Sequence, residues 1–169
     1  MKTIKKSADV VIAGSGPGGA TVARGLARAG KKVLLLEKGT NFKYIGNHPS
    51  ALLTSDRMGL NFTEEGLNIV RAITAGGSTI MYCGAATPPP PYLKEKYGID
   101  LDKYVEETID ELDLQPLPDE VIGVGGLRIL EAGNELGYEF EKMRKFIDPG
   151  KCRSRCGGTC MLGCPVGAK

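Results

Sequence analysis

The feature that most constrains this chain is a glycine-rich turn close to its N-terminus. Gly14, Gly16 and Gly19 form a G-x-G-x-x-G motif that follows a short apolar run and opens a segment with helical spacing. Residues 8–37 therefore predict a strand, a tight turn, a helix ending near Gly30 and a second strand, which together make a βαβ unit. We expect an α/β fold with a Rossmann-like core, long insertions and an incomplete C-terminus.

The turn has the chemistry of a dinucleotide-binding site. Gly14 permits the tight turn, Gly16 lets backbone amides approach a pyrophosphate, and Gly19 lets helix and strand pack closely. The positive end of the helix dipole then faces the phosphates. Glu37, which closes the second strand, can accept hydrogen bonds from both ribose hydroxyls, and its charge disfavours NADP. The spacing alone leaves FAD and NAD open.

A second glycine cluster lies in residues 71–79, whose sequence is RAITAGGST. Together with the first motif and Glu37, it resembles the N-terminal part of the glucose-methanol-choline (GMC) oxidoreductases. That part carries G-x-G-x-x-G, a strand-ending Glu and an Arg-x4-Gly-Gly-Ser segment in this order. The resemblance covers essentially the whole chain, and a short helix is expected after the second cluster.

The resemblance implies that the cofactor is FAD. It implies that the ADP half is held by Gly14, Ser15, Gly16, Gly19, Glu37 and Lys38. In the segment that begins at Arg71, it implies that Gly76, Gly77, Ser78 and Thr79 run beside the pyrophosphate and the isoalloxazine ring.

Four of the five cysteines are spaced as C-x3-C-x3-C-x3-C near the end of the chain. Glycines and a proline among them predict a loop that could wrap thiolates around one centre. Thiolates suit iron–sulfur clusters and zinc alike, and reduced structural thiols also remain open. The stretch CMLGCPVGA, residues 160–168, resembles a segment of GMC members that carry an iron–sulfur cluster. The implied ligands are Cys152, Cys156, Cys160 and Cys164.

The remaining segments give local expectations. Residues 39–74 are polar and irregular and predict a long surface excursion, with His48 on the surface. Cys83 is expected to be a small buried residue, although a redox role is open. An amphipathic helix is predicted over residues 100–114 with Asp100 as N-cap, and a second over residues 125–136, capped by Gly137.

Charge and hydropathy exclude some partners and locations. The 22 Lys plus Arg and 20 Asp plus Glu give a net charge of +2, which offers no electrostatic attraction for nucleic acid. No stretch approaches the roughly 20 apolar residues that span a bilayer, so we expect a cytoplasmic protein. Residues 1–150 are predicted to form the N-terminal part of the FAD-binding domain, and residues 151–169 a Cys-rich segment that begins a continuation.

The resemblance implies a dehydrogenase that oxidises an alcohol or sugar carbon by hydride transfer to FAD and passes electrons to an external acceptor. In the family, the catalytic base and the substrate domain lie later in the chain. No catalytic residue is therefore assigned, the substrate would bind through a missing C-terminal part, and this chain alone is expected to be inactive. The alternatives are a stand-alone FAD or iron–sulfur electron-transfer subunit that needs a partner chain, and an NAD-binding module.

Overall fold

The computed structural model describes residues 3–152 and 158–169. Backbone contacts divide the chain into two compact units. The first comprises Met1–Tyr82 and Thr159–Pro165, and the second comprises Cys83–Gly158 and Val166–Lys169. The domain boundary that the sequence suggests at residue 150 stays a prediction.

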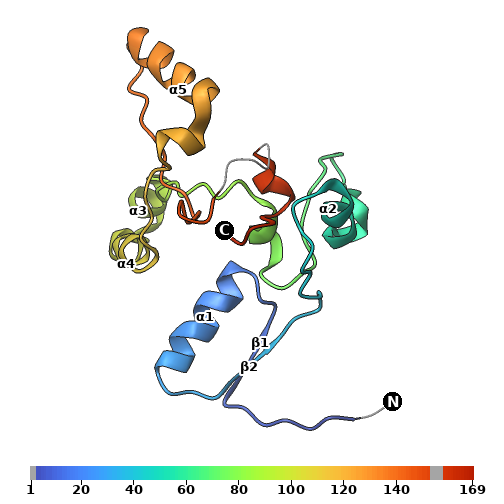
Figure 1. Ribbon diagram of the computed structural model, residues 1–169. Helices are drawn as coiled ribbons and strands as arrows, with labels where there is room; N and C mark the ends of the chain where they lie inside the picture. The colour runs from blue at the N-terminus through green and yellow to red at the C-terminus, as the bar shows by residue number, and fades with distance from the viewer. Residues whose placement is uncertain (1–2, 153–157) are drawn as a thin grey trace. The chain divides into compact units, whose positions relative to one another are not determined.

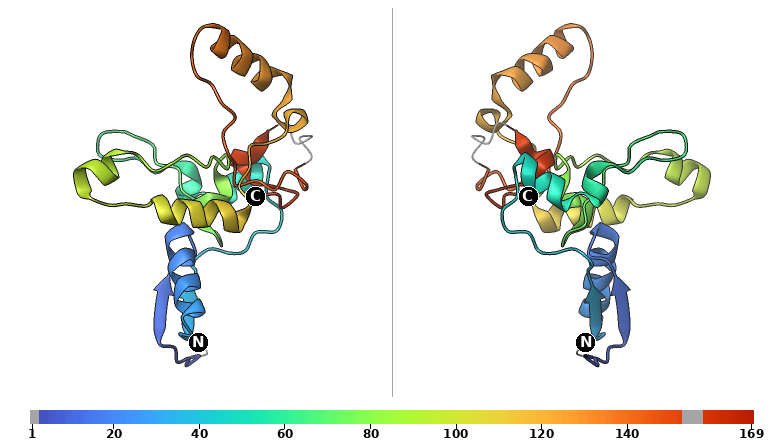
Figure 2. Two further views of the ribbon diagram at one scale, coloured as in Figure 1. Left: turned by 90° about the vertical axis from the view of Figure 1, so that its left-hand side faces the viewer. Right: turned by 90° about the vertical axis from the view of Figure 1, so that its right-hand side faces the viewer.

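The first unit begins with the expected βαβ arrangement. Strand β1 (Val10–Ala13) and strand β2 (Val33–Leu36) pair in parallel, and helix α1 (Pro17–Arg28) connects them. The register joins Val10 to Val33 and Ala13 to Leu36. Helix α1 contacts both strands, as Figures 1 and 2 show. The α/β fold class with a Rossmann-like core is confirmed.

Local sequence signals account for the boundaries of α1. Pro17 occupies the first turn, where its missing N–H costs nothing and its fixed φ suits a helix. At the other end, the N–H of Gly30 donates to the carbonyl of Ala27, and that of Lys31 donates to the carbonyl of Leu26, both at 3.0 Å. These two bonds satisfy carbonyls of the last turn. The helix end predicted near Gly30 is confirmed.

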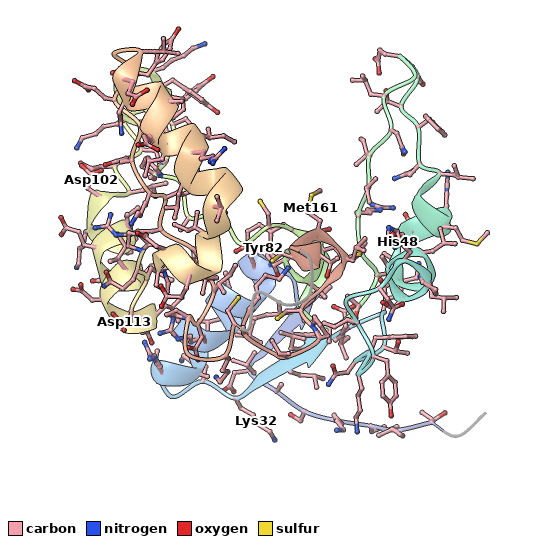
Figure 3. The ribbon with its side chains drawn as sticks, turned by 45° about the horizontal axis from the view of Figure 1, so that its top comes forward. Lys32, His48, Tyr82, Asp102, Asp113 and Met161 are labelled. Atoms are coloured by element: carbon pink, nitrogen blue, oxygen red, sulfur yellow. The ribbon has the colours of Figure 1, made fainter. Side chains whose placement is uncertain are left out.

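The stretch expected to be irregular contains a helix, so that expectation was wrong in part. Helix α2 spans His48–Thr54 and is followed by the 3-10 turn η1 (Asp56–Gly59). Asn47 caps α2: its side chain accepts from the Ser50 amide at 2.9 Å, and the Ser50 hydroxyl accepts from the Asn47 amide at 3.4 Å. This reciprocal cap, with Pro49 beside it, nucleates a helix that the polar composition obscured. His48 is exposed, as expected (Figure 3).

The second glycine cluster leads into the 3-10 turn η2 (Gly77–Met81), which confirms the short helix expected there. A further 3-10 turn, η3 (Thr159–Leu162), packs against η2 and α2 within the first unit. The Gly46 amide donates to the Leu162 carbonyl at 3.0 Å. The turn between Thr159 and Leu162 is thus anchored beside the segment that begins at Gly77.

The second unit contains three helices among its described residues. They are α3 (Tyr92–Tyr97), α4 (Asp102–Leu112) and α5 (Asp119–Glu135). Figure 3 labels Asp102 and Asp113 at the two ends of α4. The predicted N-cap was wrong, because Leu101 takes that position, whereas Asp100 accepts from the Asp102 amide at 3.0 Å. Helix α3, which follows the proline run, was not predicted.

Helix α5 begins earlier than residue 125, the expected start, and its backbone is non-helical at Gly123. Its C-terminal end agrees with the sequence. The Gly137 amide donates to the Asn134 carbonyl, and the Tyr138 amide to the Gly133 carbonyl, both at 3.0 Å. Gly137 therefore ends the helix as predicted.

Few side chains are fully buried in the described residues. The buried apolar ones are Ala51 and Ala72 in the first unit and Leu114, Ile147 and Ala168 in the second. Cys83 is exposed, so the expectation of a small buried residue was wrong. Over the described ranges, no helix is both long and apolar enough to cross a membrane.

Candidate nucleotide-binding site

The glycine turn between β1 and α1 is a close-packed junction. The Gly14 amide donates to the Leu36 carbonyl at 2.7 Å, which ties the turn to the end of β2. A Cβ atom placed on Gly19 would lie 2.1 Å from the Gly14 carbonyl oxygen. Only glycine fits at position 19, because the first turn of α1 lies directly on the backbone that leaves β1.

The space in front of this turn is open. A Cβ placed on Gly14 or Gly16 would meet no atom within 4 Å. Gly16 is the N-cap of α1, and no side chain in the described residues caps that helix end. The N-terminus of α1 therefore has no side-chain cap among the described residues, and the positive end of its dipole fits a phosphate group.

Glu37 follows β2 and is held by donors from its own chain. Its Oε2 accepts from the amide of Ser15 at 2.8 Å and from the hydroxyl of Ser15 at 2.6 Å. Its Oε1 accepts from the Gly39 amide at 2.7 Å. Led by the Ser15 hydroxyl, these hydrogen bonds lower the pKa of Glu37 to about 2. The carboxylate is therefore charged at neutral pH.

The second glycine cluster meets the first one. The Gly76 amide donates to the Ser15 hydroxyl oxygen at 2.9 Å. A Cβ on Gly77 would lie 3.1 Å from the Gly16 Cα, so the two backbones almost touch. The two glycine motifs, which the sequence shows far apart, therefore lie side by side in one unit.

A bridge that sequence reasoning missed holds this arrangement. Thr40 and Thr74 pair in parallel, and the buried Thr74 hydroxyl donates to the Thr40 carbonyl at 2.7 Å. The Ala75 amide donates to the same carbonyl at 3.2 Å. The chain after β2 thus runs beside the second glycine cluster, and no local pattern around Thr40 or Thr74 indicated this pairing.

The other predicted residues of the second cluster shape the segment itself. Arg71 is exposed and bonds Asp56 Oδ2 through Nη2 at 2.5 Å and Nε at 2.7 Å. This pair lowers the pKa of Asp56, mainly through the hydrogen bond. The Ser78 hydroxyl accepts from the Ala72 amide at 3.1 Å, and the Thr79 hydroxyl donates to the Gly76 carbonyl at 2.6 Å.

Lys38 has an exposed side chain, and its backbone amide adds to the bonds that lower the pKa of Glu37. The structure therefore brings together Gly14, Ser15, Gly16, Gly19, Glu37, Gly76 and Gly77. Ser78 and Thr79 stabilise the second cluster from within, whereas Arg71 connects it to Asp56. Asp56 was not singled out from the sequence, where it is a lone acid in the stretch that was expected to be irregular.

The cysteine segment is described only in part. Cys152, Cys160 and Cys164 are half-buried, whereas Cys156 lies outside the described residues. Within residues 3–152 and 158–169, no three His, Cys, Asp or Glu side chains gather as a metal site. The four-cysteine site stays a prediction.

Known proteins with similar sequences indicate the family of this chain. The chain matches the pyridine nucleotide-disulphide oxidoreductase family over residues 8–115. A GMC-type oxidoreductase of Mycobacterium tuberculosis, itself uncharacterised, is 30% identical over 179 residues, covering 96% of this chain and 28% of the relative. A long-chain-alcohol oxidase of Arabidopsis thaliana is 32% identical over 176 residues, covering 95% of this chain and 23% of the relative.

A second long-chain-alcohol oxidase of the same plant is 28% identical, with 98% of this chain and 24% of the relative covered. The chain thus spans about a quarter of the length of the curated relatives it matches. The range matched by the family, residues 8–115, spans both glycine motifs and Glu37. The chain therefore belongs to the pyridine nucleotide-disulphide oxidoreductase family by its nucleotide-binding domain, and to the GMC-type oxidoreductases by its relatives.

Proposed function

We propose that this chain is the FAD-binding part of a flavin-dependent dehydrogenase that oxidises the CH–OH carbon of an alcohol or sugar. The observation that carries the proposal is a pair of linked hydrogen bonds: the Gly76 amide donates to the Ser15 hydroxyl, which in turn donates to the Glu37 carboxylate. It joins a phosphate-binding turn, a ribose-binding carboxylate and a second glycine segment in one place. A turn that only reverses the chain would need none of these connections.

The residues have separate parts in holding the cofactor. The turn at Gly14 and Gly16, with the first amides of α1, would hold the phosphates. Glu37 would bind the adenosine ribose, and its negative charge at neutral pH disfavours a phosphate on that ribose. When bound, FAD supplies the hydride acceptor, while the protein supplies binding and orientation.

The choice of FAD over NAD rests on the second glycine segment and on the relatives. Both GMC-type and long-chain-alcohol oxidase relatives align over nearly the whole chain. The names of the Arabidopsis relatives state an alcohol as substrate, which supports a CH–OH substrate here. The substrate would bind to parts of the protein beyond these residues.

The proposal differs from the names of the Arabidopsis relatives in the electron acceptor. Those names describe oxidases, whereas we propose that electrons pass to an external acceptor. The observation that favours it is the packing of η3, which carries Cys160, against η2 of the flavin segment. Thiolate ligands in this turn, with Cys164 after it, would place an iron–sulfur centre beside the flavin. The alternative, a stand-alone FAD or iron–sulfur electron-transfer subunit with a partner chain, uses the same contact.

Protein purified without oxygen tests both the flavin and the external-acceptor parts of the proposal. In its visible absorption spectrum we expect flavin bands that persist through purification or appear when FAD is added. Chemical analysis of the same protein should find iron and acid-labile sulfide. A Cys160→Ser variant should lose iron and keep the flavin. Flavin without iron would refute the external-acceptor part, and binding of NAD⁺ with no affinity for FAD would refute the flavin part.

A further inference from the structure

Ser15 lies where three separate segments of the first unit meet. Its amide and its hydroxyl both donate to Glu37 Oε2, which is 22 positions away in sequence. Its hydroxyl oxygen accepts from the amide of Gly76, which is 61 positions away. All three residues are half-buried. One small side chain thus connects the glycine turn, the end of β2 and the second glycine cluster.

The direction of each hydrogen bond follows from the chemistry of the partners. An ionised carboxylate only accepts, and a backbone N–H only donates. The hydroxyl proton of Ser15 must therefore point to Glu37, while a lone pair faces Gly76. Bonds linked in this way polarise one another, so each strengthens the next. Alanine at position 15 can make neither side-chain bond, whereas threonine can make both.

We propose that Ser15 is a positioning residue, which holds the Glu37 carboxylate in place for the nucleotide ribose and links that orientation to the second glycine cluster. This inference rests on the proposed function, because it assigns Glu37 to a ribose. Glu37 contacts the ribose, and the Ser15 hydroxyl acts through Glu37. The Ser15 hydroxyl is consequently bonded to other residues of the protein, and its loss affects both Glu37 and the second glycine cluster.

The charge state of Glu37 reports on this contact. The Ser15 hydroxyl is the largest influence on the Glu37 pKa, followed by the amides of Gly39 and Ser15, with a smaller contribution from that of Lys38. Partial burial has the opposite effect and raises the pKa of Glu37. Lys38 is the adjacent charged residue; only its backbone amide acts on Glu37, whereas its charge acts on Asp56. Loss of the hydroxyl at position 15 should therefore raise the pKa of Glu37.

The test compares Ser15→Ala and Ser15→Thr with the unaltered chain. Thr21→Val is the matched control, because it removes a hydroxyl that bonds the Pro17 carbonyl on α1 and does not contact Glu37. ADP affinity is measured by calorimetry, the Glu37 titration by carbon NMR of the carboxyl group without nucleotide, and Gly76 amide protection by hydrogen exchange.

In Ser15→Ala we expect roughly tenfold weaker ADP binding, since a hydrogen bond to a charged group is lost. The Glu37 pKa should rise from about 2 towards its ordinary value of 4.5, and the Gly76 amide should exchange faster. Ser15→Thr should restore all three properties, and Thr21→Val should change none.

An unchanged Glu37 titration in Ser15→Ala would overturn the inference, whatever happens to ADP. Weaker ADP binding that Ser15→Thr does not restore would overturn it too, because the hydroxyl would then not be the cause. If the titration shifts as expected but the unaltered chain binds neither ADP nor FAD, the contact between Ser15 and Glu37 is supported and the proposed function fails.

Discussion

At the scale of single residues, the glycines of the first motif meet different demands. Gly19 is required by the fold, because the Gly14 carbonyl oxygen occupies the place of its Cβ. A Cβ placed on Gly16 would meet no atom within 4 Å, and Gly16 has a backbone conformation that other residues adopt, with φ −63° and ψ 175°. Its need for glycine would come from a bound phosphate, so folding and binding can be separated by mutation.

The Gly16→Ala and Gly19→Ala variants should therefore differ in their free energy of unfolding, while both lose affinity for FAD. Gly16→Ala should cost less than about 1 kcal/mol, because no capping side chain is lost and glycine is only modestly preferred over alanine at an N-cap. Gly19→Ala should cost about 3 kcal/mol, because the backbone itself must move. Urea unfolding and FAD titration check both values. A Gly16→Ala variant that binds FAD normally would contradict the phosphate role of the turn.

Glu37 should make the stability of the first unit depend on pH. Its pKa is about 2 in the folded chain and ordinarily 4.5, so folding favours the charged form. The stabilisation is fully present above about pH 4.5 and is lost as the pH falls towards 2. Glu37→Gln should therefore be less stable than the unaltered chain at pH 6, and the difference should narrow at pH 3. A constant difference in urea midpoint would contradict this expectation.

At the scale of elements, the βαβ unit covers only one face of its sheet. Helix α1 packs on β1 and β2, and Val10 and Ile12 are half-buried, whereas Val11 between them is 59% exposed. Parallel sheets normally have both faces covered, because their strands are apolar on both sides. The short apolar strands predicted from the sequence thus belong to a sheet that is covered on one side in the described residues.

Helix α5 allows a clean test of backbone strain. A Cβ on Gly123 or Gly125 would meet no atom within 4 Å, but Gly123 has φ 78° and ψ 165°. Gly123→Ala should destabilise the second unit by about 1–3 kcal/mol, and Gly125→Ala should stabilise it by about 0.5–1 kcal/mol. Circular dichroism during urea unfolding measures both changes. Equal effects would mean that the backbone at Gly123 is not strained.

At the scale of the whole molecule, the candidate site belongs entirely to the first unit. That unit is built from residues at both ends of the chain, since Thr159–Pro165 joins Met1–Tyr82. A ligand that binds only the folded first unit must stabilise that unit by mass action. The second unit carries none of the predicted FAD-binding residues.

FAD should therefore protect the two units unequally. At a free concentration of 100 times Kd, FAD should stabilise the first unit by about 2.7 kcal/mol. Amides of β1 and β2 should then exchange more slowly with solvent, and those of α5 should not. NADP⁺ at the same concentration is the control and should give no protection, because of the charge on Glu37. Equal protection by NADP⁺ would contradict the ribose assignment.

The local parts of the fold were predictable from the sequence. The βαβ unit, the short helix after Gly76 and Gly77, and the helix ends near Gly30 and Gly137 all follow from spacing and turn residues within a few positions. Helix α2 was also a local signal, in the form of the Asn47 and Ser50 cap, but the polar composition around it obscured the cap. The candidate residues of the first motif and Glu37 were identified in the same way.

Only the tertiary structure showed how these parts meet. The bond from Gly76 to Ser15 spans 61 positions and the bond from Thr74 to Thr40 spans 34. The turn η3 contacts η2 from the far end of the chain. Periodicity and turn chemistry describe neighbours in sequence, whereas these contacts depend on how long loops close and which backbone donors then find acceptors. The sequence by itself therefore determined the parts of a nucleotide site, and the fold decided that Ser15 joins them.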